Sequence, residues 1–450
     1  MSPYKKYRRH STDNGPGEPY PAVRLKYLFF ILLALAAQVV CAQTNVLTLA
    51  DARNQALEHN WDILAAKSGV GNATAQLIMA KEFPNPTASL STAKIGLHEA
   101  GTTMGNGLWD RSYDTIAAVS QLIEIGGKRR DRQVAARAGV LGAKARFYDA
   151  KRTLDEGVTQ AYIAALLADE NERVLKESAG LMRHEADIAQ VQFNTGDLSA
   201  ADKKTLEINA DQFELQVRGA AAAAVQARVA VEVLMGSGQP TGNWMPGDTL
   251  ETLVAVPPGL TNEPESGALR PDVLAAQADL QGGEAELKLQ QAMRIPDPTV
   301  SLGVEHNPPG GGPAVDTINI GVSFPLPLWN RNGGSIKSAQ AAVDQFKEAL
   351  GKIQTQAQAD LAVAESVYHE AFERWRRYQD ELAPKSAQVR ESVAFQYEKG
   401  AASLVDLLNA EQTDNTVRLA LAQAMNDTAS AVAGLQAART ALTETEVNGD

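Results

Sequence analysis

The sequence repeats itself once, with two copies about two hundred residues apart. Four short motifs of the first half return in the same order: Asp62-Ile63-Leu64-Ala65-Ala66 as Asp272-Val273-Leu274-Ala275-Ala276, Pro84-Asn85-Pro86-Thr87 as Pro296-Asp297-Pro298-Thr299, Asp114-Thr115-Ile116 as Asp316-Thr317-Ile318, and Phe193-Asn194-Thr195-Gly196 as Tyr397-Glu398-Lys399-Gly400. The offsets of 210, 212, 202 and 204 residues vary so little that they indicate duplication of one structural unit. Each copy has only two predicted strands, which are too few for an independent sheet.

Residues 1–42 have the composition of a secretory signal peptide. Six basic residues precede an apolar run from Tyr27 to Val40, and Val40-Cys41-Ala42 supplies small residues for cleavage after Ala42. The apolar run is short for a membrane span. Because Val40 occupies the position where a lipid-attachment site has Gly, Ala or Ser, the sequence favours removal of Cys41 with the leader over its lipidation.

The mature chain is acidic and lacks cysteine. Without the six basic and two acidic residues of the leader, 36 Lys plus Arg face 52 Asp plus Glu, which gives a formal charge of −16. This charge argues against nucleic acid as a partner. Loss of Cys41 excludes disulfides, thiolate metal sites and cysteine nucleophiles. No later stretch approaches the ~18 uninterrupted apolar residues of a membrane helix, so membrane insertion would require strands.

Composition and periodicity predict a mainly α fold with a small β part, organised as two repeats. We expect a first structural repeat over residues 43–235, an irregular equatorial connector over 236–269 and a second structural repeat over 270–450. Each repeat is predicted to contain a helix, a β-hairpin and a long helical coiled-coil hairpin. The helical hairpins should turn near residue 196 and near residue 400, where glycines end the long helices.

The predicted helices are much longer than those of an ordinary domain. No proline occurs from about residue 128 to 194, and a helix of this length would extend roughly 100 Å. From residue 335 to 397 the only expected kink is at Pro384.

The β-hairpins are predicted at about residues 87–123 and 299–324. Thr299 to His306 and Val315 to Phe324 alternate apolar with polar side chains, whereas the first copy alternates less cleanly. About ten alternating residues can cross a bilayer when the strand is tilted. Strands half-buried in a soluble sheet are the alternative interpretation.

Four membrane strands per chain cannot close a barrel, because open edges are not tolerated in lipid and the smallest barrels have about eight strands. The chain is therefore expected to oligomerise. Two, three or four copies would supply enough strands, and periodicity does not choose between them. The long helices would continue the barrel wall as a tunnel in the periplasm.

Several motifs resemble the outer membrane efflux protein family, the TolC-like ducts, over nearly the whole mature chain. They are Leu47-Thr48-Leu49-Ala50-Asp51-Ala52, Pro84-Asn85-Pro86, Gly126-Gly127-Lys128-Arg129, Pro296-Asp297-Pro298 and Pro325-Leu326-Pro327-Leu328-Trp329-Asn330-Arg331-Asn332. The last string, with Gly126-Gly127-Lys128-Arg129, is similar to the heavy-metal cation branch (CzcC-like). The family usually has proline where this chain has Trp61, so we expect a local change at that helix entry.

The resemblance implies a homotrimer with a 12-stranded β-barrel and a helical tunnel in the outer membrane of a Gram-negative bacterium. It further implies a periplasmic adaptor (membrane fusion) protein and an inner-membrane RND pump as partners. The cargo implied is a divalent heavy-metal cation. A duct for drug efflux or type I protein secretion is the alternative within this class, and a structural periplasmic coiled coil is the alternative outside it.

The turns of the helical hairpins are the first candidate functional site. Gly196 and Gly400 suit a left-handed helix end, while Ser199 and Ser403 suit N-caps of the following helices. Good turn chemistry alone would explain these residues. The family resemblance implies that the tips, including Asp202, dock the adaptor.

The second candidate site is a periplasmic gate at Asp406 and Asn409. The spacing of three residues places both side chains on one helix face. The resemblance implies an acidic ring at these positions, with an amide here at the second. Repeated around a threefold axis, Asp406 would bring three carboxylates together. The competing interpretation is a solvated helix residue, and for Asp202 a helix N-terminal charge is the favoured interpretation.

No metal site, cofactor or catalytic residue is predicted. The six histidines do not occur at ligand spacing, and no nucleophile–base pair or phosphate loop is present. His306 and His369 are interpreted as surface residues.

Overall fold

The computed structural model describes residues 45–93, 114–254, 269–307 and 316–448. The predicted leader, residues 1–42 with Cys41, lies outside the described residues, as do residues 255–268 of the predicted connector. Leu47 and the described residues that follow it form one compact unit.

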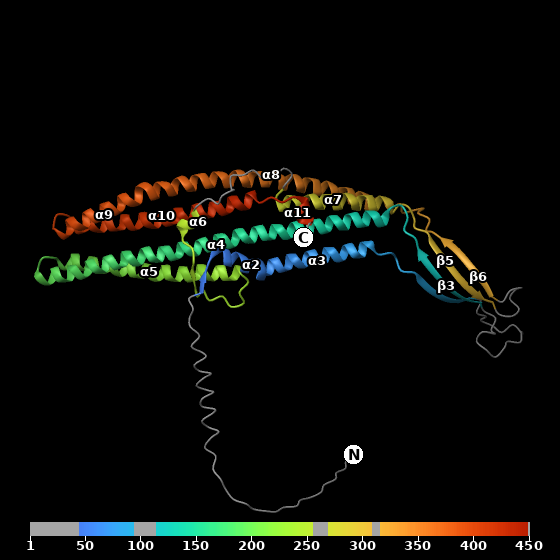
Figure 1. The fold of residues 1–450 in the computed structure, drawn as a ribbon, viewed down its shortest axis with the longest axis horizontal. Coiled ribbons are helices and arrows are strands. Elements are labelled where there is room, and N and C mark those ends of the chain that lie inside the picture. Colours follow the sequence, from blue (N-terminus) through green and yellow to red (C-terminus); the bar gives the residue numbers. More distant parts are fainter. Residues whose placement is uncertain (1–44, 94–113, 255–268, 308–315, 449–450) are drawn as a thin grey trace, which may run out of the picture. The chain divides into compact units, whose positions relative to one another are not determined.

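Long helices form most of this unit and run side by side (Figure 1). α4 (Lys128–Thr195) has 68 residues without a break, which is about 100 Å at 1.5 Å per residue. The other long helices are α3 (Trp61–Lys81), α5 (Ala200–Leu234), α7 (Pro271–Ala292), α8 (Gly333–Arg377), α9 (Ala383–Glu398) and α10 (Leu404–Arg439). Alanine dominates their buried positions, so neighbouring backbones approach closely.

Several of the remaining elements are short. They are β1 (Asn45–Leu47), α2 (Leu49–His59), β4 (Trp244–Pro246), α6 (Leu250–Val254) and α11 (Glu444–Asn448). At Trp61, where a local change was expected, the side chain of Asn60 caps α3 by accepting from the backbone N–H groups of Asp62 and Ile63. The corresponding helix α7 begins instead with Pro271.

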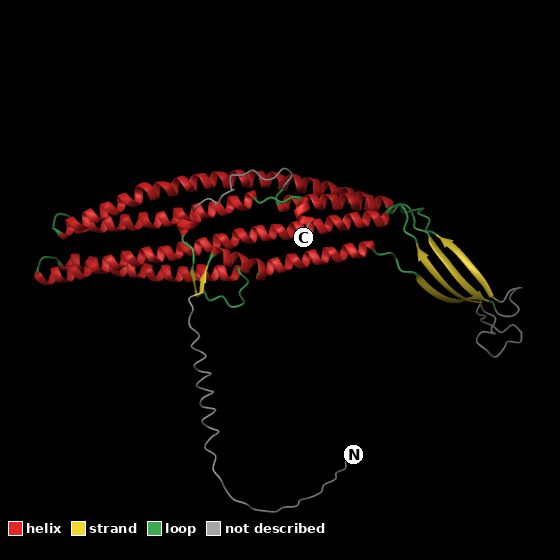
Figure 2. Ribbon diagram, in the orientation of Figure 1, coloured by secondary structure: helices red, strands yellow, loops and turns green. Residues whose placement is uncertain are grey.

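One antiparallel sheet stands at one end of the helices (Figure 2). Its strands are β2 (Thr87–Ala93), β3 (Asp114–Leu122), β5 (Thr299–His306) and β6 (Asp316–Ser323), in the order β2-β3-β5-β6. Both repeats contribute two strands, and β3 and β5 join them with Val119 opposite Leu302. The hairpin loops 94–113 and 308–315 lie outside the described residues.

The register separates the side chains of the sheet into an apolar and a polar face. Leu302 faces Val119 on one neighbour and Ile320 on the other, and all three are more than half exposed. The same face carries the exposed residues Leu90, Val300, Val304, Ile318 and Val322. The opposite face carries mostly small polar residues and glycines: Ser89, Ser91, Ser120, Ser301, Gly303, Thr317, Asn319 and Gly321. No described element of the chain covers the apolar face.

The outer edges of β2 and β6 have no strand partner among the described residues. Because three antiparallel pairings separate them, β2 and β6 run in opposite directions. The sheet could therefore be extended by a second sheet of the same kind through another antiparallel pairing.

The helices nearest the sheet keep the order of its strands. α3 packs on α4, α4 on α7, and α7 on α8. Towards the other end, α5 packs on α4, α4 on α10, and α10 on α9. In Figure 1 the α4–α5 and α9–α10 hairpins end at the same end of the unit, opposite the sheet.

The second long helix is interrupted before Pro384 by a π-helical turn, Tyr378–Leu382, between α8 and α9. The N–H of Ala383 donates to the carbonyl of Tyr378, five residues earlier, and Pro384 is the second residue of α9. Proline lacks an N–H and its ring clashes with the carbonyl four residues back, so a widened turn relieves the conflict. The predicted irregularity at Pro384 thus takes the form of a π turn one residue upstream.

Tyr162 of α4 fastens the short elements to the helices. Its side chain is fully buried, stacks on Trp244 and donates to the carbonyl of Leu47 and to Asp248 Oδ2 at 2.8 and 2.9 Å. Asp248 also accepts from the N–H of Leu49 at 2.8 Å. Burial raises the pKa of the Tyr162 hydroxyl, which therefore remains a donor at neutral pH.

Among the described residues, no helix combines the length and the apolar content needed to traverse a lipid bilayer.

Replacing Tyr162 with phenylalanine should lower the free energy of unfolding by about 1–2 kcal/mol, because the hydrogen bonds of the buried hydroxyl to the Leu47 carbonyl and to Asp248 are lost. The measurement is urea unfolding in detergent, followed by circular dichroism. Tyr368→Phe is the matched control, since that ring is only partly buried. Equal destabilisation by both variants would contradict the anchoring role of Tyr162.

Candidate functional site: the helical tips and the groove

The first tip joins α4 to α5 through a tight turn. Gly196 has φ +88°, and the N–H of Asp197 donates to the carbonyl of Gln192 at 2.9 Å. Ser199 then caps α5, because its Oγ accepts from the N–H of Asp202 at 3.1 Å. Ser199 Oγ also donates to Asp202 Oδ2 at 2.8 Å. A left-handed backbone here is accessible to glycine at low cost.

The second tip joins α9 to α10 with the same geometry. Gly400 has φ +73°, and the N–H of Ala401 donates to the carbonyl of Gln396 at 2.8 Å. Ser403 and Asp406 form a capping box: Ser403 Oγ accepts from the N–H of Asp406, while Asp406 Oδ2 accepts from the Ser403 N–H at 3.1 Å. The two copies of the repeat therefore build equivalent tips.

Asp406 and Asn409 are both exposed on α10. In the single chain the Asp406 carboxylate is part of the cap of α10. Hydrogen bonds from the Ser403 side chain and backbone lower the pKa of Asp406 below its ordinary value, so it is charged at neutral pH. Asn409 accepts a hydrogen bond from Thr413 through its backbone carbonyl.

A buried polar layer lies two to three turns inside the second tip, and sequence reasoning missed it. Arg390 of α9 lies between Asp414 and Glu411 of α10, at 3.3 and 3.7 Å, and Ser386 donates to Asp414 at 2.8 Å. Burial raises the pKa of Glu411, while Arg390 opposes this shift. The sequence shows the polar residues Glu411, Asp414 and Asn415, but their burial becomes evident only in the structure.

Polar contacts also join the two helical hairpins to each other. Ser178 of α4 donates to Asn415 Oδ1 of α10 at 3.0 Å, and Glu177 pairs with Arg418. The hydrogen bond from Arg418 is the largest cause of the lowered pKa of Glu177. These contacts fix the register between α4 and α10.

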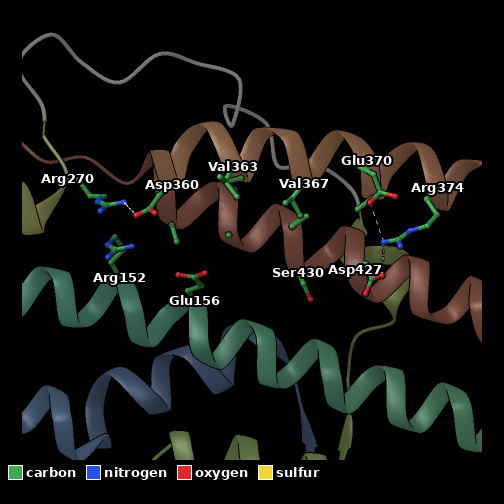
Figure 3. Close-up of a pocket in the computed structure, with 16 residues that line it drawn as sticks. Arg152, Glu156, Arg270, Asp360, Val363, Val367, Glu370, Arg374, Asp427 and Ser430 are labelled. Atoms are coloured by element: carbon green, nitrogen blue, oxygen red, sulfur yellow. Dashed lines mark hydrogen bonds and ion pairs between the residues drawn. The ribbon is translucent and has the colours of Figure 1, made fainter. Parts of the chain in front are cut away.

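A groove of about 510 Å³ lies between α4, α8 and α10 (Figure 3). At one end Arg270 pairs with Asp360 at 2.8 Å, and at the other Arg374 pairs with Asp427 at 2.8 Å. Figure 3 shows Val363 and Val367 between these pairs. Since the charges at each end are paired, we interpret the groove as part of the packing between helices.

Burial raises the pKa of Glu156, which lines this groove from α4, whereas the charge of Arg152 lowers it.

In the part of the chain that the structure describes, no three histidine, cysteine or acidic side chains are arranged to hold a metal ion.

Long paired helical hairpins, capped tips and a small sheet with an uncovered apolar face define the class of protein. The chain matches the outer membrane efflux protein family over residues 52–237 and 265–439, and it belongs to that family. It is thus an outer-membrane efflux channel protein.

Two relatives and one solved structure illustrate the similarity. The cobalt-zinc-cadmium resistance protein CzcC of Cupriavidus metallidurans is 25% identical over 369 residues, covering 82% of this chain and 84% of CzcC. The pyoverdine export outer membrane protein OpmQ of Pseudomonas aeruginosa is 22% identical over 403 residues, covering 82% and 81%. The structure of CusC, described in terms of transmembrane channel formation, superposes with a TM-score of 0.71 at 18% identity, covering 87% of this chain and 91% of CusC.

Proposed function

We propose that three copies of this chain close into a 12-stranded barrel and a continuous helical tunnel that serves as the exit duct of a tripartite efflux system. The observation that carries this proposal is the pair of open sheet edges, β2 and β6, which run in opposite directions. A copy rotated about an axis along the barrel could pair its β2 with β6 of its neighbour. Repetition around a ring would leave no edge unpaired.

The chemistry of the sheet supports insertion in lipid. Eight exposed aliphatic side chains on one face would be costly in water and favourable in a bilayer, whereas the Ser- and Gly-rich face suits an aqueous lumen. The strands have seven to nine residues, close to the length of membrane strands.

The helices would extend the wall into the periplasm. α4 alone is about three times longer than a bilayer core is thick. The tips around Gly196, Ser199, Asp202, Gly400 and Ser403 would then lie far from the membrane. There they would dock a periplasmic adaptor coupled to an inner-membrane RND pump.

Three copies of Asp406, with Asn409 one turn further, would form the gate of the tunnel. The carboxylate is exposed and charged in the single chain, so threefold symmetry would concentrate negative charge at the narrow end. Asp406 could cap α10 and belong to such a ring at the same time, because a carboxylate can accept several hydrogen bonds.

In planar bilayers, Asp406→Ala should weaken blockade of the channel by divalent cations. In the wild type, blockade should also weaken when the pH falls below the lowered pKa of Asp406, because protonation removes the charge of the carboxylate. Ser403→Ala removes the capping hydroxyl but keeps the carboxylate, and it should retain blockade at neutral pH. Unchanged blockade in Asp406→Ala would contradict the gate.

Gly400→Asp should abolish resistance while trimers still assemble in the outer membrane. The substitution adds a charge and a Cβ at φ +73° on the docking surface, far from the sheet. Gly351→Asp, in an open position on α8, is the control and should preserve resistance. Trimer content is read from unheated electrophoresis of membranes; loss of the trimer in Gly400→Asp would refute a pure docking role.

The proposed cargo is a divalent heavy-metal cation. The name of CzcC, with 25% identity over most of both chains, supports this cargo, and an acidic mature chain of charge −16 would favour cations over anions. The similarity to OpmQ, whose name specifies pyoverdine export, supports an organic cargo as the second candidate.

A deletion strain should become sensitive to cobalt, zinc or cadmium and should recover when the gene is restored. Growth inhibition across a panel of metals and organic antibiotics is the measurement. Sensitivity to antibiotics alone would replace the metal cargo with an organic one. No sensitivity to any compound would count against an efflux role for this chain.

A further inference from the structure

Exposed apolar and basic side chains occur on the four segments that connect the helices to the sheet. We define this junction belt as residues 81–86, 123–132, 293–298 and 324–337, the four segments that connect helices with strands. Its exposed apolar members are Phe83, Ile123, Ile125, Met293, Ile295, Phe324, Leu326, Leu328 and Trp329. Trp329 is 94% exposed, the most exposed of the large apolar side chains described. Such side chains need a cover that the single chain does not provide.

The junction belt is basic although the chain as a whole is acidic. It contains eight cations, Lys81, Lys128, Arg129, Arg130, Arg132, Arg294, Arg331 and Lys337, against four carboxylates, Glu82, Glu124, Asp131 and Asp297. Three of these carboxylates already pair with cations of the belt: Glu124 with Arg132 at 2.6 Å, Asp297 with Lys128 at 2.7 Å and Asp131 with Arg130 at 3.5 Å. The belt therefore has excess positive charge at its surface.

The other arginines of the belt are exposed or partly exposed. Arg129 stacks on the ring of Phe83 at 3.8 Å from its centroid and donates to the carbonyl of Lys81. Its neighbour Arg130 is 82% exposed, with Asp131 at 3.5 Å. Arg294 and Arg331 are exposed on the segments that enter β5 and α8.

We propose that the junction belt binds the phosphate headgroups of anionic glycerophospholipids in the periplasmic leaflet of the outer membrane. This inference rests on the proposed function, which puts the apolar face of the sheet in lipid and the helices in the periplasm. The belt then coincides with the boundary between acyl chains and water. Aromatic rings and arginines are stable at this boundary, and arginine binds phosphate through paired N–H groups.

The test measures lipid preference in reconstituted vesicles. The mature protein is placed in phosphatidylcholine vesicles that contain either brominated phosphatidylglycerol or brominated phosphatidylcholine, and quenching of tryptophan emission is compared. The contribution of Trp329 is identified by its loss in Trp329→Phe. We expect phosphatidylglycerol to be preferred about fivefold or more, the effect of roughly one basic residue at a membrane surface.

Removing the exposed arginines should remove this preference. The variant Arg130→Gln/Arg294→Gln/Arg331→Gln should bind the two lipids about equally. The matched control is Lys67→Gln/Arg218→Gln/Lys352→Gln, which removes three exposed cations from the helices; Lys67 and Lys352 lie roughly 20 Å or more along their helices from the belt. The control should keep the wild-type preference.

The outcomes separate this inference from the proposed function. The inference is overturned if the wild type shows no preference for phosphatidylglycerol, or if the belt variant keeps the wild-type preference. Either result would leave the proposed function intact as long as channels form in pure phosphatidylcholine. Absence of channels from planar bilayers overturns the proposed function and the inference together. If the belt variant fails to assemble, the single variant Arg331→Gln is measured instead. Its preference for phosphatidylglycerol over phosphatidylcholine should fall at least about twofold. An unchanged preference would overturn the inference.

Discussion

The outer edges of β2 and β6, which have no strand partner in the part of the chain that the structure describes, are the constraint on which the rest of this structure depends. A backbone edge has no water partner inside lipid, so it must be paired by another strand. In this chain the apolar face of the sheet is also uncovered, with Leu302 and Ile320 more than half exposed. Each protomer is thus incomplete in two respects, and the proposed closed ring of equivalent copies in a membrane would resolve both.

The helices follow the geometry that the sheet sets. α3, α4, α7 and α8 continue the order of the four strands, so a ring of sheets would also be a ring of helices. Alanine at the buried positions permits close packing, while Ser178–Asn415 and Glu177–Arg418 fix the relation between α4 and α10. Tyr162 ties the short elements to this wall. The capped turns at Gly196 and Gly400 end the wall at defined points.

Local chemistry made several features predictable. Alternating residues located β5 at Thr299–His306, and the two glycines with their following serines located the tips, because these signals depend on neighbouring residues alone. The π turn at Tyr378–Leu382 was not predictable, since proline permits either a kink or a widened turn. The layer of Arg390, Glu411 and Asp414 was missed because polar residues in a long helix look solvated until the packing partner is known. Likewise, the capping bond of Asp406 gives that carboxylate a structural role beside any gating role.

The number of chains in the membrane-extracted assembly tests the central claim most directly. The mature protein would be extracted from outer membranes in mild detergent, and its mass determined by native mass spectrometry together with amide hydrogen exchange of β2 and β6. Our account predicts three copies, with the edge strands protected as well as the central strands β3 and β5. A stable monomer with an intact sheet and rapidly exchanging edges would contradict it.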